Sequence, residues 1–347
     1  MVYDAQKLEQ YAAAIMEKVG LSPEKAARFA ESLLVAEKRG ITSHGLTRLK
    51  AYSYRLEAGL VDAQAEPTVL SDAPSFLLVD ANNGLGVCMA HEVMEMCVER
   101  ARETGACFAA VRGGNHFGIG AYFSDYAAQN DMIGVAVTNG PKAIAPTGGK
   151  EALFGTNPLS VSIPAGKYRN FTLDMATSMV ARGKVTLAKK EGRSIPEGWG
   201  IDANGNPTTD PAQVKTMLPF GGPKGYGIAM IIEILCSCLS GAATGLTMGS
   251  FYDYSGKKQD VGYFLGALDI SRITPIDDFK ARMDELIETV KGSQKATGVQ
   301  EIFVPGEIEL NKAQRTEQEG VKLSEAVLAE LKEIGEKYGV PFNCEKE

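Results

Sequence analysis

Three side chains with complementary chemistry stand close together in the segment SHGLTR, residues 43–48. The chain has only three histidines, so His44 is one of few groups that could act as a general acid or base near neutral pH. Ser43 and His44 could bracket a reacting oxygen, and Arg48 could hold a carboxylate through its two-pronged donor face. The structural alternative makes Ser43 a helix N-cap and leaves the other side chains in solvent.

A second histidine, His116, stands in the segment VRGGNHFGIGAYF. A β-like run ends there in two glycines, and two further glycines lead into a helical run. Glycine-rich loops at strand ends let a backbone approach a ligand closely, which favours a binding or catalytic role for His116 over the alternative of a helix cap. His91 lies within a helical run of apolar and charged residues, which favours a structural or surface role.

The elements that must position these residues change in character along the chain. Residues 1–65 carry helical spacing, with Ser22 as an N-cap and Pro23 at the first helical position, and they are expected to form part of the substrate site. Residues 66–276 alternate β-rich runs (SFLLVDA, CFAAVRG, MIGVAVTN and LSVSIPA) with helical ones, which predicts an α/β core with a loop excursion near 189–216; the family resemblance described below makes this core the cofactor-binding one. Residues 277–347 return to amphipathic helices, which we expect to pack on the N-terminal region.

Composition bounds the partners of the chain. It has 347 residues, 44% hydrophobic and 23% charged, with a net charge of −7 and no stretch dense in lysine or arginine, which argues against nucleic acid and membranes as partners. No apolar run approaches the length of a bilayer span, so we expect a cytoplasmic protein. Cys236 and Cys238 are too close together for a zinc-binding CxxC motif, and we expect the six cysteines to be free thiols with no metal site. The apolar run 226–243 predicts a helix buried inside the protein or against a second subunit.

The glycine-rich stretches do not match the common nucleotide motifs. NNGLGVCMA lacks the third glycine of the dinucleotide fingerprint and its acidic partner. In LPFGGPKGYG, Lys224 is followed by glycine where a P-loop needs serine or threonine. A Rossmann domain is therefore disfavoured.

Five segments together resemble the malate/L-lactate dehydrogenase family, in its order and at its spacing over almost the whole chain: SHGLTRL, GGNHFGIGAYF, APTGGKEALFGTNPLS, FTLDMATSMVARGKV and LPFGGPKGYG. The resemblance implies a homodimer with a non-Rossmann sheet that binds NAD or NADP. It also implies hydride transfer between the nicotinamide and C2 of a small 2-hydroxy or 2-oxo acid of the malate, lactate, ureidoglycolate or sulfolactate type.

The resemblance also suggests roles for single residues. His44 matches the proton donor of some family members and His116 the proton acceptor assigned in others, and the sequence does not choose between them. Ser43 would orient His44, Arg48 would bind the C1 carboxylate and Tyr52 would line the pocket. The residues that match cofactor-holding segments are Asn139, Asp174, Met175, Ala176, Lys224, Gly225, Val304, Pro305 and Gly306. NAD is the expected cofactor, with NADP as the alternative.

Two other functions are compatible with the resemblance. Members that reduce cyclic imines carry an aspartate at the relay position of ARGKV, where this chain has Lys184, which favours hydroxy acids. A non-catalytic small-acid-binding protein would not need both histidines and Arg48, and all three are present.

Overall fold

The centre of the molecule is a seven-stranded sheet, seen in the computed structural model, which describes residues 2–346. Only the pair of β3 and β4 is parallel, and the other neighbours are antiparallel. The sheet is therefore not the parallel, doubly wound sheet of a Rossmann fold, as expected. In spatial order the strands are β2 (Thr68–Ala73), β3 (Phe76–Asp80), β4 (Ala106–Gly114), β10 (Val261–Asp269), β5 (Met132–Thr138), β6 (Leu159–Ile163) and β7 (Phe171–Met175).

Helices cover both faces of this sheet. The long helix α4 (Gly86–Thr104) and the shorter α5 (Ala121–Gln129) pack on one face, and their apolar side chains join the main core. Helix α7 (Pro223–Glu233) and the π-helical turn Ile234–Cys238 pack on the other face, where Ile232 and Cys236 meet Val137 of β5. The predicted α/β core is confirmed.

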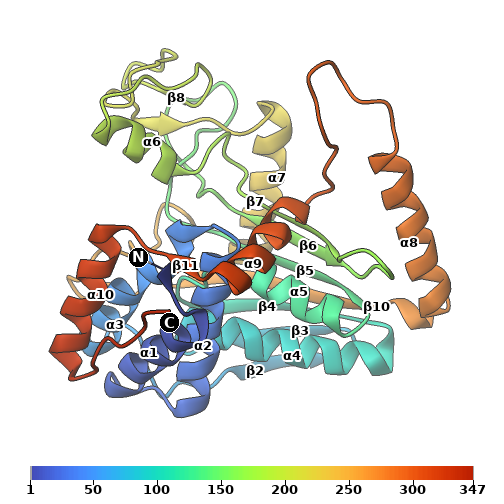
Figure 1. Ribbon diagram of the computed structural model, residues 1–347, viewed down its shortest axis with the longest axis horizontal. Coiled ribbons are helices and arrows are strands. Elements are labelled where there is room, and N and C mark those ends of the chain that lie inside the picture. The colour runs from blue at the N-terminus through green and yellow to red at the C-terminus, as the bar shows by residue number, and fades with distance from the viewer. Residues whose placement is uncertain (1, 347) are drawn as a thin grey trace.

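The N- and C-terminal segments form one helical layer beside the sheet (Figure 1). Strand β1 (Val2–Tyr3) pairs with β11 (Val321–Lys322), and helix α10 (Glu325–Tyr338) packs on α1 (Ala5–Lys18) and α3 (Leu49–Glu57). Helix α9 (Glu307–Glu319) packs on α2 (Pro23–Lys38). Helix α2 begins as predicted, with the Ser22 side chain accepting the N–H of Lys25 at 3.3 Å.

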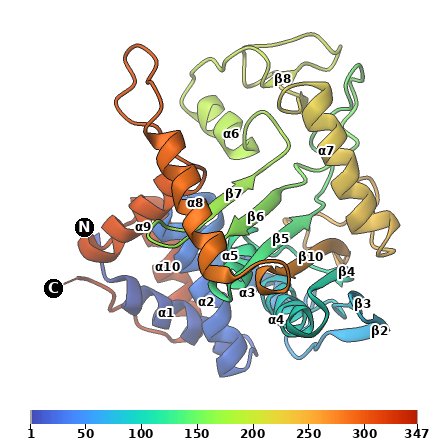
Figure 2. The ribbon, with the colours of Figure 1, turned by 90° about the vertical axis from the view of Figure 1, so that its right-hand side faces the viewer.

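A small lobe extends beyond β7 and carries the excursion near 189–216 (Figure 2). It contains α6 (Arg182–Lys190) and the two-stranded pair of β8 (Gly200–Ile201) and β9 (Thr216–Met217), with its own apolar cluster around Ile144 and Met217. Helix α8 (Ile276–Lys291) follows β10, and its Asp284 accepts the backbone N–H of Lys167 at 2.8 Å in the turn between β6 and β7. Within residues 2–346, no helix combines the length and the apolar character needed to cross a bilayer.

Candidate active site

The strand register brings the predicted site segments to one edge of the sheet. Gly114 at the end of β4 pairs with Val261 at the start of β10, and Tyr263 of β10 pairs with Thr138 at the end of β5. Leu159 at the start of β6 pairs with Met175 at the end of β7. The loop that carries His116, the residues after β5 and the residues after β7 therefore leave the sheet on the same side.

The SHGLTR segment forms two consecutive 3₁₀ turns, Thr42–His44 and Leu46–Arg48, directly before α3. The hydroxyl of Ser43 lies 3.0 Å from Nδ1 of His44, and Nε of Arg48 donates to the Ser43 carbonyl at 2.5 Å. Ser43 does not cap α3, which starts without a side-chain cap. Its hydroxyl instead forms the contact with the His44 ring.

The two histidines that the sequence singled out lie against each other. Their rings are stacked, with centroids 5.5 Å apart and an angle of 20° between the planes. The hydroxyl of Tyr52, a buried residue of α3, lies 2.5 Å from Nδ1 of His116. The backbone N–H of Gly118 points at the same nitrogen at 3.4 Å, and the side chain of Gln259 accepts the His116 N–H at 3.1 Å.

Burial and positive charge keep both imidazoles neutral. Burial, and then the charge of Arg48, lower the pKa of His44 from 6.5 to about 4. Burial also lowers the pKa of His116 well below its usual range, with further contributions from His44, Arg48 and Arg55. Arg48 itself forms no ion pair in the described part of the chain, and its two Nη groups donate to no protein acceptor there. The guanidinium is thus available to an anion.

Two aromatic residues of a distant loop, Phe251 and Tyr252, pack against the site. The Phe251 ring lies 4.9 Å from the His116 ring and 5.1 Å from the Tyr52 ring, centroid to centroid. The Arg48 Cζ atom lies 5.5 Å from the centroid of Tyr252 and 5.8 Å from that of Phe251. These contacts hold the guanidinium beside the histidines.

Arg55 of α3, whose exposed fraction is 0%, links the loop that carries Phe251 and Tyr252 to this helix. Its Nη1 donates to the Phe251 carbonyl at 3.1 Å, and its Nη2 lies 3.5 Å from Oδ1 of Asn115, the neighbour of His116. Sequence reasoning missed five residues of the site, Arg55, Asn115, Phe251, Tyr252 and Gln259. The only available signal was that Arg55 follows Tyr52 by three positions and so shares its helix face.

The segments expected to hold the cofactor converge on β7. Asp174 accepts the N–H of Ala121 at the start of α5 at 2.9 Å, and burial raises the pKa of Asp174 from 3.8 to about 6. Met175 ends the strand and Ala176 follows it. Beyond them, Thr177 accepts the N–H of Phe220 at 3.0 Å. That pairing places the start of α7, with the exposed Lys224 and the buried Gly225, next to the end of β7.

The third of these segments, residues 304–306, packs against β7. The Thr172 N–H donates to the Pro305 carbonyl at 3.2 Å. A Cβ on Gly306 would lie 2.6 Å from the Thr172 carbonyl oxygen, so only glycine fits this approach, and its φ of +86° also favours glycine. Val304 precedes this contact, and its N–H donates to the Glu307 carboxylate at 3.1 Å.

Asn139 lies at the same edge with its amide already occupied. Its Nδ2 donates to the Ala243 carbonyl at 2.8 Å and its Oδ1 accepts the N–H of Gly262 at 3.0 Å. His91 lies apart, buried in α4 between Tyr122 and Tyr126. No group of three or more His, Cys, Asp or Glu side chains among residues 2–346 is arranged to hold a metal ion.

Comparison with known proteins agrees with this geometry. The model of the family described as malate/L-lactate dehydrogenase matches residues 3–332. The chain belongs to this family. It is similar to L-sulfolactate dehydrogenase of Methanocaldococcus jannaschii, with 37% identity over 94% of both chains. It is also similar to the NAD(+)-dependent ureidoglycolate dehydrogenase of Escherichia coli, with 31% identity over 88% of both chains.

Solved structures of the family carry the same fold. Malate dehydrogenase from Entamoeba histolytica superimposes with a TM-score of 0.94 at 28% identity over 99% of both chains. A delta1-piperideine-2-carboxylate reductase from Pseudomonas syringae is similar too, with a TM-score of 0.86 at 28% identity over 96% of this chain and 99% of that one. The family fold therefore carries both hydroxy-acid and imine chemistry.

Because the histidines are neutral in the folded protein, we expect the free energy of unfolding to decrease as the pH falls through a defined range. Because the pKa of His44 is about 4 in the folded protein and 6.5 when unperturbed, the unfolded chain binds more protons between these values, and stability falls as the pH drops through them. The wild type should lose on the order of 1 to 2 kcal/mol relative to His44→Gln between pH 7 and pH 5. Urea unfolding of both proteins across this range measures the difference, and parallel stability curves would contradict it.

Proposed function

We propose that the protein is an NAD(P)-dependent dehydrogenase that interconverts a small 2-hydroxy acid and the corresponding 2-oxo acid. The observation that carries this function is the stacked pair of neutral imidazoles beside the unpaired Arg48 guanidinium, in a member of a dehydrogenase family. Relatives named for NAD(+) and for NADP(+) both occur, so either cofactor is compatible with the family.

The hydrogen bonds support different roles for the two histidines. A backbone N–H can only donate, so the contact from Gly118 makes Nδ1 of His116 an acceptor and leaves the proton on Nε2. Neutral His116 can then donate a hydrogen bond from Nε2 but cannot accept a proton there. His44 can donate from Nδ1 to the Ser43 hydroxyl, which leaves its Nε2 free to accept. His44 is therefore the proposed proton-transfer residue, and His116 orients the substrate oxygen.

In this mechanism Arg48 fixes the C1 carboxylate, and Tyr52 holds the His116 ring in place. In oxidation, neutral His44 accepts the hydroxyl proton, and in reduction the protonated ring returns it to the carbonyl oxygen. A bound substrate carboxylate would offset the charge of Arg48 and so raise the pKa of His44 towards the range that donation needs.

The residues around β7 and α7 fit a dinucleotide. Lys224 is exposed in the first turn of α7, where the helix N-terminus adds partial positive charge, and the N–H groups of Lys224 and Gly225 donate to the carbonyls of Gly221 and Phe220. Two glycines with positive φ, Gly221 and Gly222, precede it, and a Cβ at Gly222 would meet nothing within 4 Å. We propose that this turn binds the diphosphate and that Asp174 to Ala176 and Val304 to Gly306 line the rest of the site. The cofactor supplies or receives the hydride.

We also propose that the protein is a homodimer and that it is located in the cytoplasm. Helix α7 and the turn after it leave Met230, Ile231, Ile234 and Leu239 between 43% and 57% exposed, which supports a homodimer that covers this face. All six cysteines are free thiols, with no disulfide in the described part of the chain, which supports a cytoplasmic location.

A spectrophotometric panel tests the proposed activity. Oxaloacetate, pyruvate and sulfopyruvate, each with NADH and with NADPH, should include at least one pair that oxidises the reduced nicotinamide. A cyclic imine such as Δ1-piperideine-2-carboxylate should be a poorer substrate, since Lys184 stands exposed on α6 where imine-reducing members carry aspartate. Binding of these acids without any turnover would favour a non-catalytic binding protein.

The two histidine variants should fail in different ways. His44→Ala should lower turnover by about 10²- to 10⁴-fold and flatten the pH dependence of oxidation, because the acid/base group is gone. His116→Ala should lose rate and substrate affinity while the pH profile persists. Steady-state rates against pH for both variants decide this. A flat profile in His116→Ala, with a normal one in His44→Ala, would reverse the roles.

The dimer proposal predicts the mass of the active species. Light scattering on the purified protein should give twice the mass of the chain, and Ile231→Asp, which places a charge on the exposed face of α7, should shift the protein towards monomer. An active wild-type monomer would contradict the proposal.

A further inference from the structure

Glu37 is a buried residue whose carboxylate has no role in the mechanism proposed above. It lies at the end of α2 with 7% of its surface exposed. Burying a carboxylate costs free energy unless hydrogen bonds or an opposite charge compensate it. No ion pair involves Glu37 within residues 2–346, so its burial requires another explanation.

The carboxylate is hydrogen-bonded to the catalytic segment. Its Oε2 accepts the backbone N–H of Leu46 at 3.0 Å. The N–H groups of His44, Gly45 and Arg48 bind carbonyls of their own 3₁₀ turns, whereas the N–H of Leu46 lies between the two turns. Glu37 thus satisfies a backbone donor that would otherwise lack a partner at this joint.

Gly45 shows how closely the carboxylate approaches the joint. A Cβ at residue 45 would lie 2.1 Å from Oε2 of Glu37, a distance that real atoms do not allow. A larger residue at position 45 would therefore push the Glu37 carboxylate away from the Leu46 N–H.

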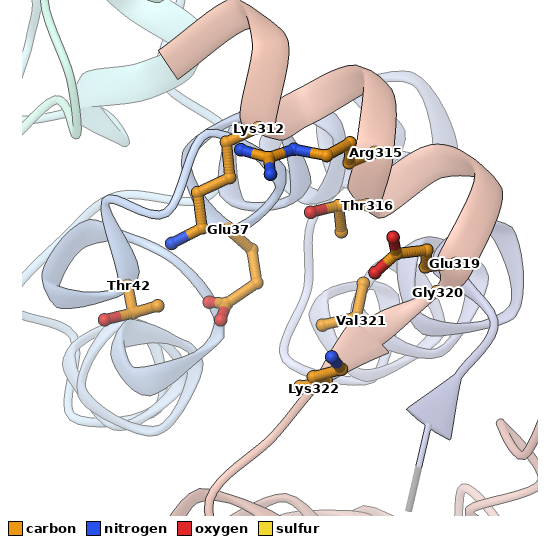
Figure 3. A pocket seen from close by; sticks show the side chains of 9 residues that line it. All are labelled: Glu37, Thr42, Lys312, Arg315, Thr316, Glu319, Gly320, Val321 and Lys322. Atoms are coloured by element: carbon orange, nitrogen blue, oxygen red, sulfur yellow. The ribbon is translucent and has the colours of Figure 1, made fainter. Parts of the chain in front are cut away.

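The other side of Glu37 faces a cavity of about 340 Å³ between α2, α9 and β11 (Figure 3). In Figure 3 the side chains of Lys312 and Glu37 point into the same space. Burial raises the pKa of Glu37 above its usual value, and the Leu46 N–H and the charge of Lys312 offset part of that rise. The cavity is lined by acidic side chains as well as basic ones, and its charges do not select one ligand.

We propose that Glu37 is a positioning residue that holds the joint between the turn carrying His44 and the turn carrying Arg48. This inference rests on the proposed function, in which His44 transfers the proton and Arg48 binds the carboxylate. Because Glu37 touches only the backbone between them, it sets their relative placement without contacting the substrate. Catalysis is sensitive to such placement, since displacements of about 1 Å cost about 10²-fold in rate.

Four variants separate this role from general stability. Glu37→Gln keeps an oxygen acceptor for the Leu46 N–H, whereas Glu37→Ala removes it. Gly45→Ala displaces the carboxylate by collision. The double variant Glu37→Ala with Gly45→Ala removes the carboxyl atoms at 2.1 and 3.1 Å and leaves the new methyl group a tight contact of 3.2 Å with the Cβ of residue 37. Glu317→Gln, which removes a surface carboxylate that pairs with Lys38, is the matched control.

We expect Glu37→Ala to lower kcat/KM for the best 2-oxo acid of the panel by about 10- to 100-fold, with the Kd for NADH changed less than about 2-fold. Glu37→Gln should recover most of that loss, and the control should match the wild type. Gly45→Ala should lose as much as Glu37→Ala, and the double variant should lose clearly less than the product of the two.

Calorimetric binding of oxalate to the NADH complex gives a readout that does not depend on turnover. Oxalate should bind about 10-fold more weakly to Glu37→Ala than to the wild type, because the guanidinium and the imidazole are no longer held together. Wild-type kcat/KM and oxalate affinity in Glu37→Ala would overturn the inference, as would equal losses of NADH and oxalate affinity. A wild type that turns over none of the panel would contradict the proposed function, and the oxalate titration would still decide the role of Glu37.

Discussion

The candidate site depends on one contact between the helical layer and the sheet, the hydrogen bond between Tyr52 and His116. The two residues are 64 positions apart, one on α3 and the other in the loop after β4. Apolar packing alone is non-directional and would not fix the orientation of an imidazole. The Tyr52 hydroxyl fixes the orientation of the ring, the Gly118 N–H makes its Nδ1 an acceptor, and the contact brings the SHG and GNH segments together.

The electrostatics of the site are set by two arginines, Arg48 and Arg55, that lie close to the neutral rings of His44 and His116. The Nη groups of Arg55 donate to backbone carbonyls and an amide oxygen, whereas the Nη groups of Arg48 have no protein acceptor in the described part of the chain. A buried cation without an opposite charge is costly. A small acid would supply the missing negative charge through its carboxylate. The same charge would raise the pKa of His44, so in the proposed mechanism the bound 2-oxo acid would itself favour the protonated form of His44.

The sequence predicted the parts of this structure that local patterns encode. The runs that became β3, β4, β5 and β6, and the helices α2, α4 and α5, carried clear periodicity and turn signals. The central strand β10 was missed because its residues, VGYFLGALD, are buried on both faces and show no alternation. Its pairing with β4 and β5 is a property of distant contacts that no local window contains.

The site residues divide in the same way. His44, Arg48 and His116 stood in short segments whose composition marked them, and Tyr52 was named through the family resemblance. Phe251 and Tyr252 arrive on a loop with no motif of its own, and their place is set by Arg55 and not by their neighbours in sequence. The role of Glu37 was also invisible, because a glutamate near the end of a charged helix usually faces solvent.

The antiparallel sheet explains why the dinucleotide fingerprint is absent. In a parallel sheet only the carboxyl ends of strands meet at the ligand-binding edge, and one glycine-rich turn after the first strand can bind the diphosphate. Here the ends of β4, β5 and β7 share an edge with the starts of β6 and β10, so segments before and after strands all reach it.

That edge is held in shape by buried amides. Nδ2 of Asn157 donates to the Glu233 carboxylate at 2.9 Å, and the same carboxylate accepts the N–H of Gly245 at 2.8 Å. Asn139 joins this network through Glu233 and the backbone of β10. With its amide fully used in this way, Asn139 has no amide group left for a ligand. The proposed recognition of the nucleotide therefore rests on the end of β7 and on the exposed Lys224 of α7.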